Sequence, residues 1–204
     1  MSQDSTDAAP RPGAARKSIG AKRNPASADA IRKAAAEILE KDGYARFSIE
    51  AVARRAHAGK PTIYRWWPSK AALLVDIYHR QKQGMPDPDT GRLADDLAIF
   101  LEGLLRLWRE TPSGAIFRSI IAEAQSDETA AEALRAYLDE RIAHSSQMIR
   151  RAQARGEIAS GIDPASAMDL VISLAWCRLL TGRLDMETAA VKAAVSLFVE
   201  SWRA

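Results

Sequence analysis

Helical spacing of the apolar side chains constrains the fold of this 204-residue chain more than any other feature. From Ile31 to Trp202, apolar residues recur three and four positions apart, which places them on one face of an α-helix. The strict alternation of apolar and polar residues that marks a half-buried strand is not sustained anywhere. The sequence therefore predicts an all-α protein of about nine helices, separated by short segments rich in Gly, Pro, Ser and Asp.

Residues with the chemistry of helix ends divide this pattern into segments. Ser27, Ser48 and Ser69 are predicted N-caps, because a serine oxygen can accept a hydrogen bond from a free N–H of the first helical turn. Asp163 precedes a proline, and this pair predicts the start of a later helix in the same way. Between these points, we expect one long helix to run unbroken from about residue 129 to 155.

A change in composition at residues 84–91 (GMPDPDTG) predicts a boundary between two parts of different charge. Residues 1–83 hold 16 basic and 8 acidic side chains, a net charge of +8, whereas the remainder holds 13 and 18, a net charge of −5. We expect a disordered basic arm over 1–26, a basic helical unit over 27–83 and an acidic helical unit over 84–204. A basic unit suits a polyanionic partner, although chance clustering of solvated charges gives the same pattern.

Several classes of protein are not expected. The chain has no apolar run of about 18 residues, so no membrane span is predicted, and Met1–Ala9 lacks the apolar segment of a secretory signal. We therefore expect a cytoplasmic protein. Cys177 is the one cysteine, and His57, His79 and His144 have no partner at metal or catalytic spacing. We expect no metal, no other cofactor and no enzymatic activity.

Residues 60–67 (KPTIYRWW) form the most informative segment. Pro61 suits the first turn of a helix, and Pro68 ends that helix within two turns. A short helix that follows another helix across a tight turn indicates a helix-turn-helix, whose second helix enters the major groove of DNA. Ile63 and Trp67 are four residues apart and are predicted to face the core. The candidates for contact with bases or phosphates are Lys60, Thr62 and Arg65.

The stretch from Ile31 to Tyr78 resembles the DNA-binding domain of the TetR family of bacterial transcriptional regulators. The resemblance rests on Gly43-Tyr44, on Phe47-Ser48-Ile49 and above all on residues 62–70 (TIYRWWPSK). It implies a ligand-responsive DNA-binding regulator, most simply a repressor, that binds a palindromic operator as a homodimer.

The resemblance extends the set of residues expected to contact DNA. Tyr64 and Trp66 match positions that touch phosphates in the family, and Ser48 and Lys70 lie at predicted helix N-termini, where backbone N–H groups favour phosphate. The complete predicted set is Ser48, Lys60, Thr62, Tyr64, Arg65, Trp66 and Lys70.

The resemblance also implies two roles for the C-terminal helices. Family members dimerise through the last two helices, and the expected interface residues are Val171, Leu174, Ala175, Val191, Ala194, Val195 and Phe198. The middle helices of the family enclose a ligand pocket, and the expected lining is Leu104, Trp108, Phe117, Ile121, Met148, Trp176 and Cys177. Aromatic and sulfur-containing side chains suit an unknown small, apolar ligand.

Two other functions remain open at this point. The first is a helical small-molecule-binding or adaptor protein without DNA recognition, against which the charge division and the cations near residue 65 argue. The second is an all-α enzyme, which no residue pattern in the sequence supports. The sequence does not distinguish a repressor from an activator.

Overall fold

The computed structural model of the chain describes residues 25–82 and 84–203, and every regular element within them is helical. The prediction of an all-α fold is therefore confirmed. The first elements are α1 (Pro25–Lys41), the 3₁₀ turn η1 (Tyr44–Arg46), α2 (Ile49–Arg55), α3 (Lys60–Trp66) and α4 (Lys70–Gln81). They are followed by α5 (Leu93–Glu110), α6 (Ser113–Ala124), α7 (Glu128–Ser145), α8 (Gln147–Ala154), α9 (Pro164–Leu180) and α10 (Thr188–Trp202).

The start of α1 differs from its prediction. Ser27 is not the N-cap, because the helix already begins at Pro25, whose fixed φ and missing N–H suit a first turn. Residues 1–24 of the predicted basic arm lie outside the described residues, and Pro25 and Ala26 belong to α1. The other predicted N-caps are confirmed. Each side-chain oxygen accepts a hydrogen bond from a backbone N–H three residues later, over 2.8 to 3.1 Å, at Ser48, Ser69 and Asp163.

The long helix predicted over residues 129–155 was wrong, because the chain bends at Ser146 and forms α7 and α8 instead. The hydroxyls of Ser145 and Ser146 donate hydrogen bonds to the carbonyls of Arg141 and Ile142. Side-chain bonds of this kind to the carbonyl four residues earlier bend a helix. The described residues consequently hold ten α-helices instead of about nine.

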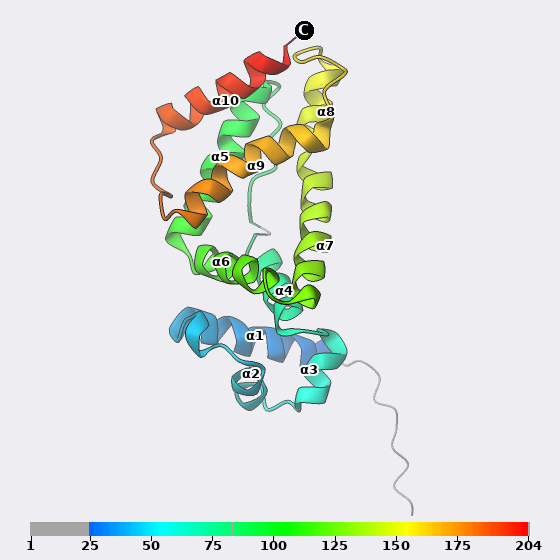
Figure 1. Ribbon diagram of the computed structural model, residues 1–204, viewed down its shortest axis with the longest axis vertical. Helices are drawn as coiled ribbons and strands as arrows, with labels where there is room; N and C mark the ends of the chain where they lie inside the picture. Colours follow the sequence, from blue (N-terminus) through cyan, green and yellow to red (C-terminus); the bar gives the residue numbers. More distant parts are fainter. Residues whose placement is uncertain (1–24, 83, 204) are drawn as a thin grey trace, which may run out of the picture.

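Helices α1, α2 and α3 form one end of the molecule, at the bottom of Figure 1. Their shared interior includes Ile31, Ala35, Val52 and Ile63, each with no exposed surface. The turn between α2 and α3 passes through His57, whose φ of 50° is a left-handed conformation. The resulting helix-turn-helix has the geometry predicted from residues 60–67. Helix α4 leaves this unit and packs against α6 and α7 of the upper part.

The remaining helices form the upper part of Figure 1. Helix α5 packs against α10 and α9, while α6 and α7 pack against each other and against α4. The loop before α5 is attached to α8, because Arg151 donates a hydrogen bond of 2.7 Å to the carbonyl of Pro88 and Arg155 lies 3.7 Å from Asp89. No described helix is long and apolar enough to cross a membrane. The arrangement leaves a cavity between α4, α5, α6, α7 and α9.

Candidate nucleic-acid interface and ligand pocket

Helix α3 presents a polar face to solvent and an apolar face to the core. Tyr64 is 47% exposed and Arg65 is exposed beside it, whereas Thr62 is half-buried. Ile63 has no exposed surface and Trp67 only 5%, so the prediction that both face the core is confirmed. Some side chains of this helix therefore pack against the core, and others remain exposed to solvent.

Trp67 anchors α3 to the helices behind it. Its indole N–H donates a hydrogen bond of 2.9 Å to Asp76 on α4, and the Arg32 guanidinium of α1 lies 5.1 Å from the centre of its ring. Arg32 also donates a hydrogen bond of 2.6 Å to the same Asp76 oxygen. Trp66 is half-buried and its ring lies 6.2 Å from that of Trp67. These contacts hold the exposed face of α3 in one orientation.

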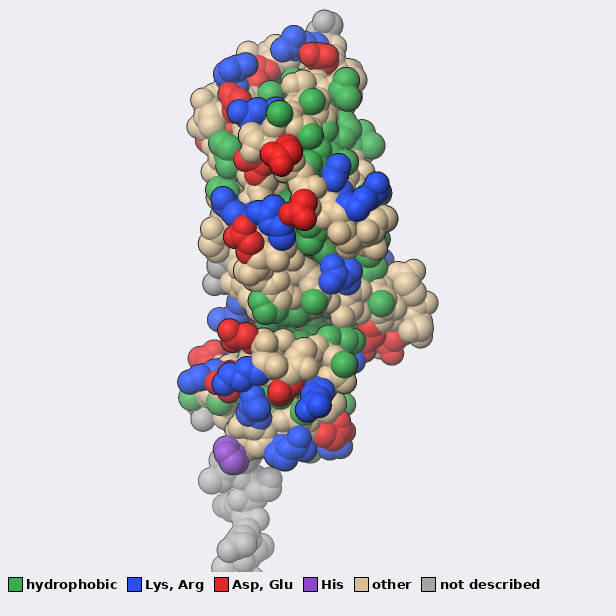
Figure 2. Space-filling view, turned by 90° about the vertical axis from the view of Figure 1, so that its left-hand side faces the viewer, with side chains coloured by type: hydrophobic (Ala, Val, Ile, Leu, Met, Phe, Trp, Pro, Cys, Tyr) green, Lys and Arg blue, Asp and Glu red, His purple; other side chains and the backbone are tan. Residues whose placement is uncertain are grey.

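An ion pair joins α2 to α3 beside this exposed face. The Lys60 ammonium lies 2.6 Å from a carboxylate oxygen of Glu50, and both side chains are exposed. The pair lowers the pKa of Glu50 and raises the pKa of Lys60. Figure 2 shows Lys and Arg side chains, with Asp and Glu among them, over both the upper part and the lower part, to which α1, α2 and α3 belong.

The structure places Lys70 at the junction between the two parts. Its ammonium lies 4.5 Å from the centre of the Tyr44 ring and 3.5 Å from a carboxylate oxygen of Glu123 on α6. Tyr44 donates a hydrogen bond of 2.9 Å to the same oxygen. Burial disfavours the charge of Lys70, but the contacts with Tyr44 and Glu123 outweigh it and raise its pKa. We call Tyr44, Lys70 and Glu123 the junction cluster.

The cavity of the upper part has a volume of about 270 Å³. Four of the predicted lining residues line it, namely Leu104, Trp108, Phe117 and Trp176. The other three do not. Met148 lines a smaller cavity of about 130 Å³ next to it, Ile121 is half-buried elsewhere, and Cys177 is exposed.

Stacked aromatic rings form one wall of the cavity. The rings of Tyr78 and Phe117 lie 4.5 Å apart at 11°, and those of Trp108 and Phe117 lie 5.7 Å apart at 16°. The Trp108 indole N–H donates a hydrogen bond of 2.7 Å to the Tyr78 hydroxyl. Burial raises the pKa of Tyr78 well above its usual value, so this hydroxyl stays neutral. We call Tyr78, Trp108 and Phe117 the aromatic wall.

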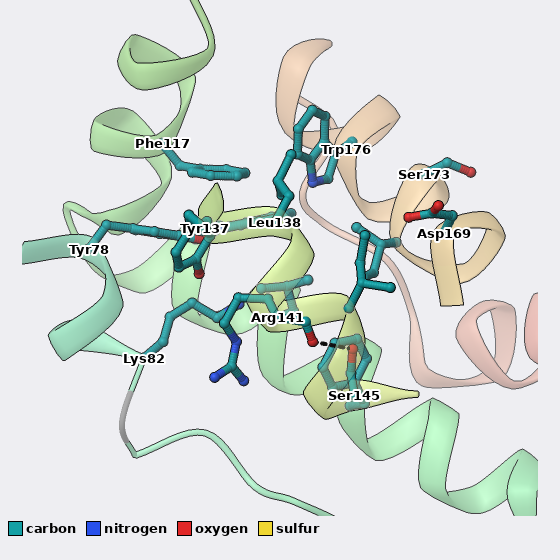
Figure 3. Close-up of a pocket in the computed structure, with 15 residues that line it drawn as sticks. Tyr78, Lys82, Phe117, Tyr137, Leu138, Arg141, Ser145, Asp169, Ser173 and Trp176 are labelled. Atoms are coloured by element: carbon teal, nitrogen blue, oxygen red, sulfur yellow. Dashed lines mark hydrogen bonds between the residues drawn. The ribbon is translucent and has the colours of Figure 1, made fainter. Parts of the chain in front are cut away.

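Sequence reasoning missed the polar residues of the same cavity. Lys82 follows α4, and Tyr137, Arg141 and Ser145 line the cavity from α7 (Figure 3). A signal for the second group was present, because residues 137, 141 and 145 recur every four positions and share one helix face. In a sequence, however, a lysine or arginine on a helix looks like a solvated charge.

The residues predicted for the dimer interface lie in two environments. Val171, Ala175, Val191 and Val195 are buried within the protomer, so they have no surface left for a partner. Leu174, Ala194 and Phe198 are half-buried. The most exposed large apolar side chains of α9 and α10 are instead Leu170, Leu180 and Leu197, and Leu197 is 70% exposed.

No group of three or more His, Cys, Asp and Glu side chains among the described residues could hold a metal ion.

Comparisons with known proteins agree with this architecture. The family described as "Bacterial regulatory proteins, tetR family" matches residues 31–77, and "Tetracyclin repressor-like, C-terminal domain" matches residues 87–198. The crystal structure of the TetR family transcription regulator SCO0332 superposes with a TM-score of 0.74 and 31% identity, covering 85% of this chain and 97% of that one.

Curated relatives support the same assignment. The DNA-binding transcriptional repressor TetR of Mycobacteroides abscessus is 34% identical over 160 residues, which cover 76% of this chain and 84% of the relative. The uncharacterized HTH-type transcriptional regulator YdeS of Bacillus subtilis is 28% identical over 163 residues, 79% of this chain and 82% of the relative. The chain therefore belongs to the TetR family of bacterial transcriptional regulators.

Proposed function

We propose that this protein is a homodimeric transcriptional repressor that binds a palindromic operator through α3 and releases it when a small ligand fills the cavity. The observation that carries the proposal is the division of α3 into an anchored apolar face and an exposed polar face, within the part of the chain that carries the net positive charge. A regulator of this kind needs no chemistry of its own and acts where the DNA is, in the cytoplasm.

The residues of the exposed face suit both kinds of DNA contact. Arg65 can donate two parallel hydrogen bonds to a guanine, the commonest base-specific contact in the major groove. Thr62 and Tyr64 are hydrogen-bonding groups beside it. The exposed Lys60 is assigned to phosphates, which fix the position of a protein on the duplex without reading its sequence. Ser48, Trp66 and Lys70 complete the predicted phosphate contacts, although the indole N–H of Trp66 is buried and Lys70 is held in the junction cluster.

Dimerisation through α9 and α10 brings two copies of α3 to one DNA duplex. Leu170 and Leu197 are exposed apolar side chains of these two helices, and Leu174, Ala194 and Phe198 are half-buried. An isologous dimer buries such side chains against its own copy. Two recognition helices about one DNA turn apart imply a palindromic operator.

Helix α4 connects the proposed ligand site to the proposed DNA site. It carries Tyr78 in the aromatic wall and, at its other end, Lys70 in the junction cluster. The hydroxyl of Ser113, at the start of α6, donates a hydrogen bond of 2.6 Å to Gln81 at the end of α4. A ligand that binds one arrangement of α4 and α6 more tightly shifts the population toward it, and with it the spacing of the two α3 helices.

The test begins with selection of bound DNA from a random pool, followed by affinity measurements on the selected sequence. Arg65→Ala should weaken binding about 10- to 100-fold and relax the preference at one base pair of each half-site. Arg150→Ala is the matched control, because Arg150 is exposed on α8 at the far end of the molecule. Binding of the original protein should also fall steeply as salt increases.

Two results would contradict the proposal. If Arg65→Ala changed neither the affinity nor the base preference, α3 would not read the operator through this residue. If the protein bound no DNA even at low salt, the adaptor function without DNA recognition would be favoured.

A further inference from the structure

We propose that the ligand of the cavity is a small aromatic carboxylic acid, whose carboxylate is held by Lys82 and Arg141 and whose rings lie against the aromatic wall. This inference rests on the proposed role of the cavity as the ligand site and names the chemical class that the site takes. Its basis is a pair of cations that line the cavity and have no anionic partner among the described residues.

Lys82 and Arg141 reach the same end of the cavity from different elements. Lys82 is the residue after α4, and Arg141 lies on α7. Both line the cavity of about 270 Å³ as well as the smaller one beside it. Figure 3 shows the two side chains next to each other, below the rings of Tyr137 and Phe117.

Neither cation forms an ion pair with a described carboxylate, although arginines elsewhere in the structure do so repeatedly. Burial and the neighbouring Arg141 lower the pKa of Lys82 to about 7. Lys82 and Arg141 are both half-buried. A cation that is partly withdrawn from water is normally paired, because leaving it unpaired costs free energy. Two like charges that share a cavity without a counterion therefore indicate a site for an anion.

The acidic residues near the cavity do not neutralise this pair. Asp87 lines the smaller cavity, but it lies 3.9 Å from His144 and 3.7 Å from Arg151, which are its partners. Asp169 lines the main cavity from α9 and is drawn away from both cations in Figure 3. No described carboxylate therefore lies against the two cations, and their end of the cavity is open to a single negative group.

The remainder of the lining defines the body of the ligand. The aromatic wall consists of rings stacked nearly parallel, and Trp176 meets Phe117 edge-on at 5.3 Å. Such rings prefer a flat partner in offset or edge contact. The volume of about 270 Å³ is slightly below the ~300 to 1,000 Å³ common for ligand pockets. A planar acid of two fused rings matches both the shape and the charge.

Three probe molecules with the same ring system but different charges test whether the cavity selects its ligand by charge or by shape. They are 2-naphthoate, its neutral amide 2-naphthamide and the cation 2-naphthylmethylammonium, each titrated into the purified full chain by isothermal calorimetry. The carboxylate should bind at least about 10-fold more tightly than the amide, as a charge-assisted hydrogen bond implies, and the ammonium more weakly still.

Variants of the two cations assign the preference to them. Arg141→Met and Lys82→Met should each reduce the ratio of carboxylate to amide affinity about 10-fold, whereas Lys82→Arg should keep most of it. Arg135→Met is the matched control, because Arg135 is exposed on the same helix as Arg141 and pairs with Glu128. This control should leave the ratio unchanged.

Three outcomes would overturn the inference: the amide or the ammonium binding as well as the carboxylate, a ratio unchanged in both Met variants, or no carboxylate binding up to about 1 mM. Since the titrations contain no DNA, they do not depend on the operator. If the preference is found but the acid leaves DNA binding unaltered, the proposed release of the operator fails and the assignment of the ligand class stands. If the protein binds DNA but shows no preference for the carboxylate over the amide, the assignment of the ligand class fails and the proposed DNA-binding function stands.

Discussion

The two ends of the molecule place their charged side chains in opposite ways. Around α3 the charges lie outside, where Lys60 pairs with Glu50, and the interior is closed by apolar residues such as Ile63. In the cavity, Lys82 and Arg141 point inward among aromatic rings and pair with no described carboxylate. A polymer such as DNA must be met on a surface, whereas a small molecule can be enclosed. Charged side chains that face outward around α3 therefore suit a large partner, and charged side chains that face into the cavity suit a small one.

The largest expected effect tests the division of α3 into two faces. Ile63→Ala should lower the free energy of unfolding by about 2–5 kcal/mol, because it opens a gap in a fully buried position. Tyr64→Ala, on the exposed face, should change stability by less than about 0.5 kcal/mol but weaken DNA binding. Urea unfolding and DNA titration of both variants check this. Equal losses of stability in the two variants would remove the distinction between the faces.

The next effect concerns the support of the aromatic wall. A Cβ at Gly114 would lie 2.4 Å from the carbonyl oxygen of Trp108, so α6 can approach the end of α5 only with glycine there. Gly114→Ala should cost about 1–3 kcal/mol of stability and weaken binding of 2-naphthoate through displacement of Trp108. Gly161→Ala is the control, since no atom lies within 4 Å of its added Cβ. A fully stable Gly114→Ala variant would show that α5 and α6 adjust freely.

A smaller effect tests the burial of charge in the cavity. The pKa of Lys82 is about 7 in the folded chain and near 10.5 when solvated, so the unfolded state binds more protons between these values. This residue should therefore make the free energy of unfolding rise with pH from about 7 to 10.5. Below pH 7 the folded protein must hold the half-buried charge, and Lys82→Met should be more stable than the original protein there.

The original protein and Lys82→Met are each unfolded in urea at pH 6 and at pH 10, at one protein concentration. The measurement compares how much the free energy of unfolding of each protein changes between the two pH values. The advantage of Lys82→Met should shrink at the higher pH. An advantage that stays constant with pH would mean that the ammonium is solvated in the folded state.

The smallest effect concerns the junction cluster, which connects the two ends. Tyr44 donates its hydrogen bond to Glu123 across the boundary between η1 and α6. A double-mutant cycle of Tyr44→Phe and Glu123→Gln should give a coupling energy of about 0.5–1 kcal/mol in stability. Additive losses would mean that this contact does not hold the two parts together.

The helix-turn-helix end was predictable in most of its detail. The apolar spacing and the caps Ser48 and Ser69 place α2, α3 and α4 close to where the structure has them, because these signals act within one or two helical turns. The start of α1 and the bend at Ser146 were not predicted correctly, because each depends on a choice between two locally acceptable arrangements.

The cavity was predictable only in part. Trp108, Phe117 and Trp176 were expected there as large apolar residues on the middle helices, and they line it. Lys82 and Arg141 were not expected, since a cation on a helix is solvated far more often than buried. Only the packing of α4 and α7 around one space reveals where these two side chains point.

The sequence by itself determined most of the helices, the division into a basic and an acidic part, and the family of regulators to which the chain belongs. These properties follow from residue spacing and local chemistry, which a linear pattern records directly. The tertiary structure alone decided which apolar residues of α9 and α10 face outward, which helices enclose the cavity and which charges lie inside it. Such properties arise from contacts between residues distant in the chain, and no short-range pattern encodes them.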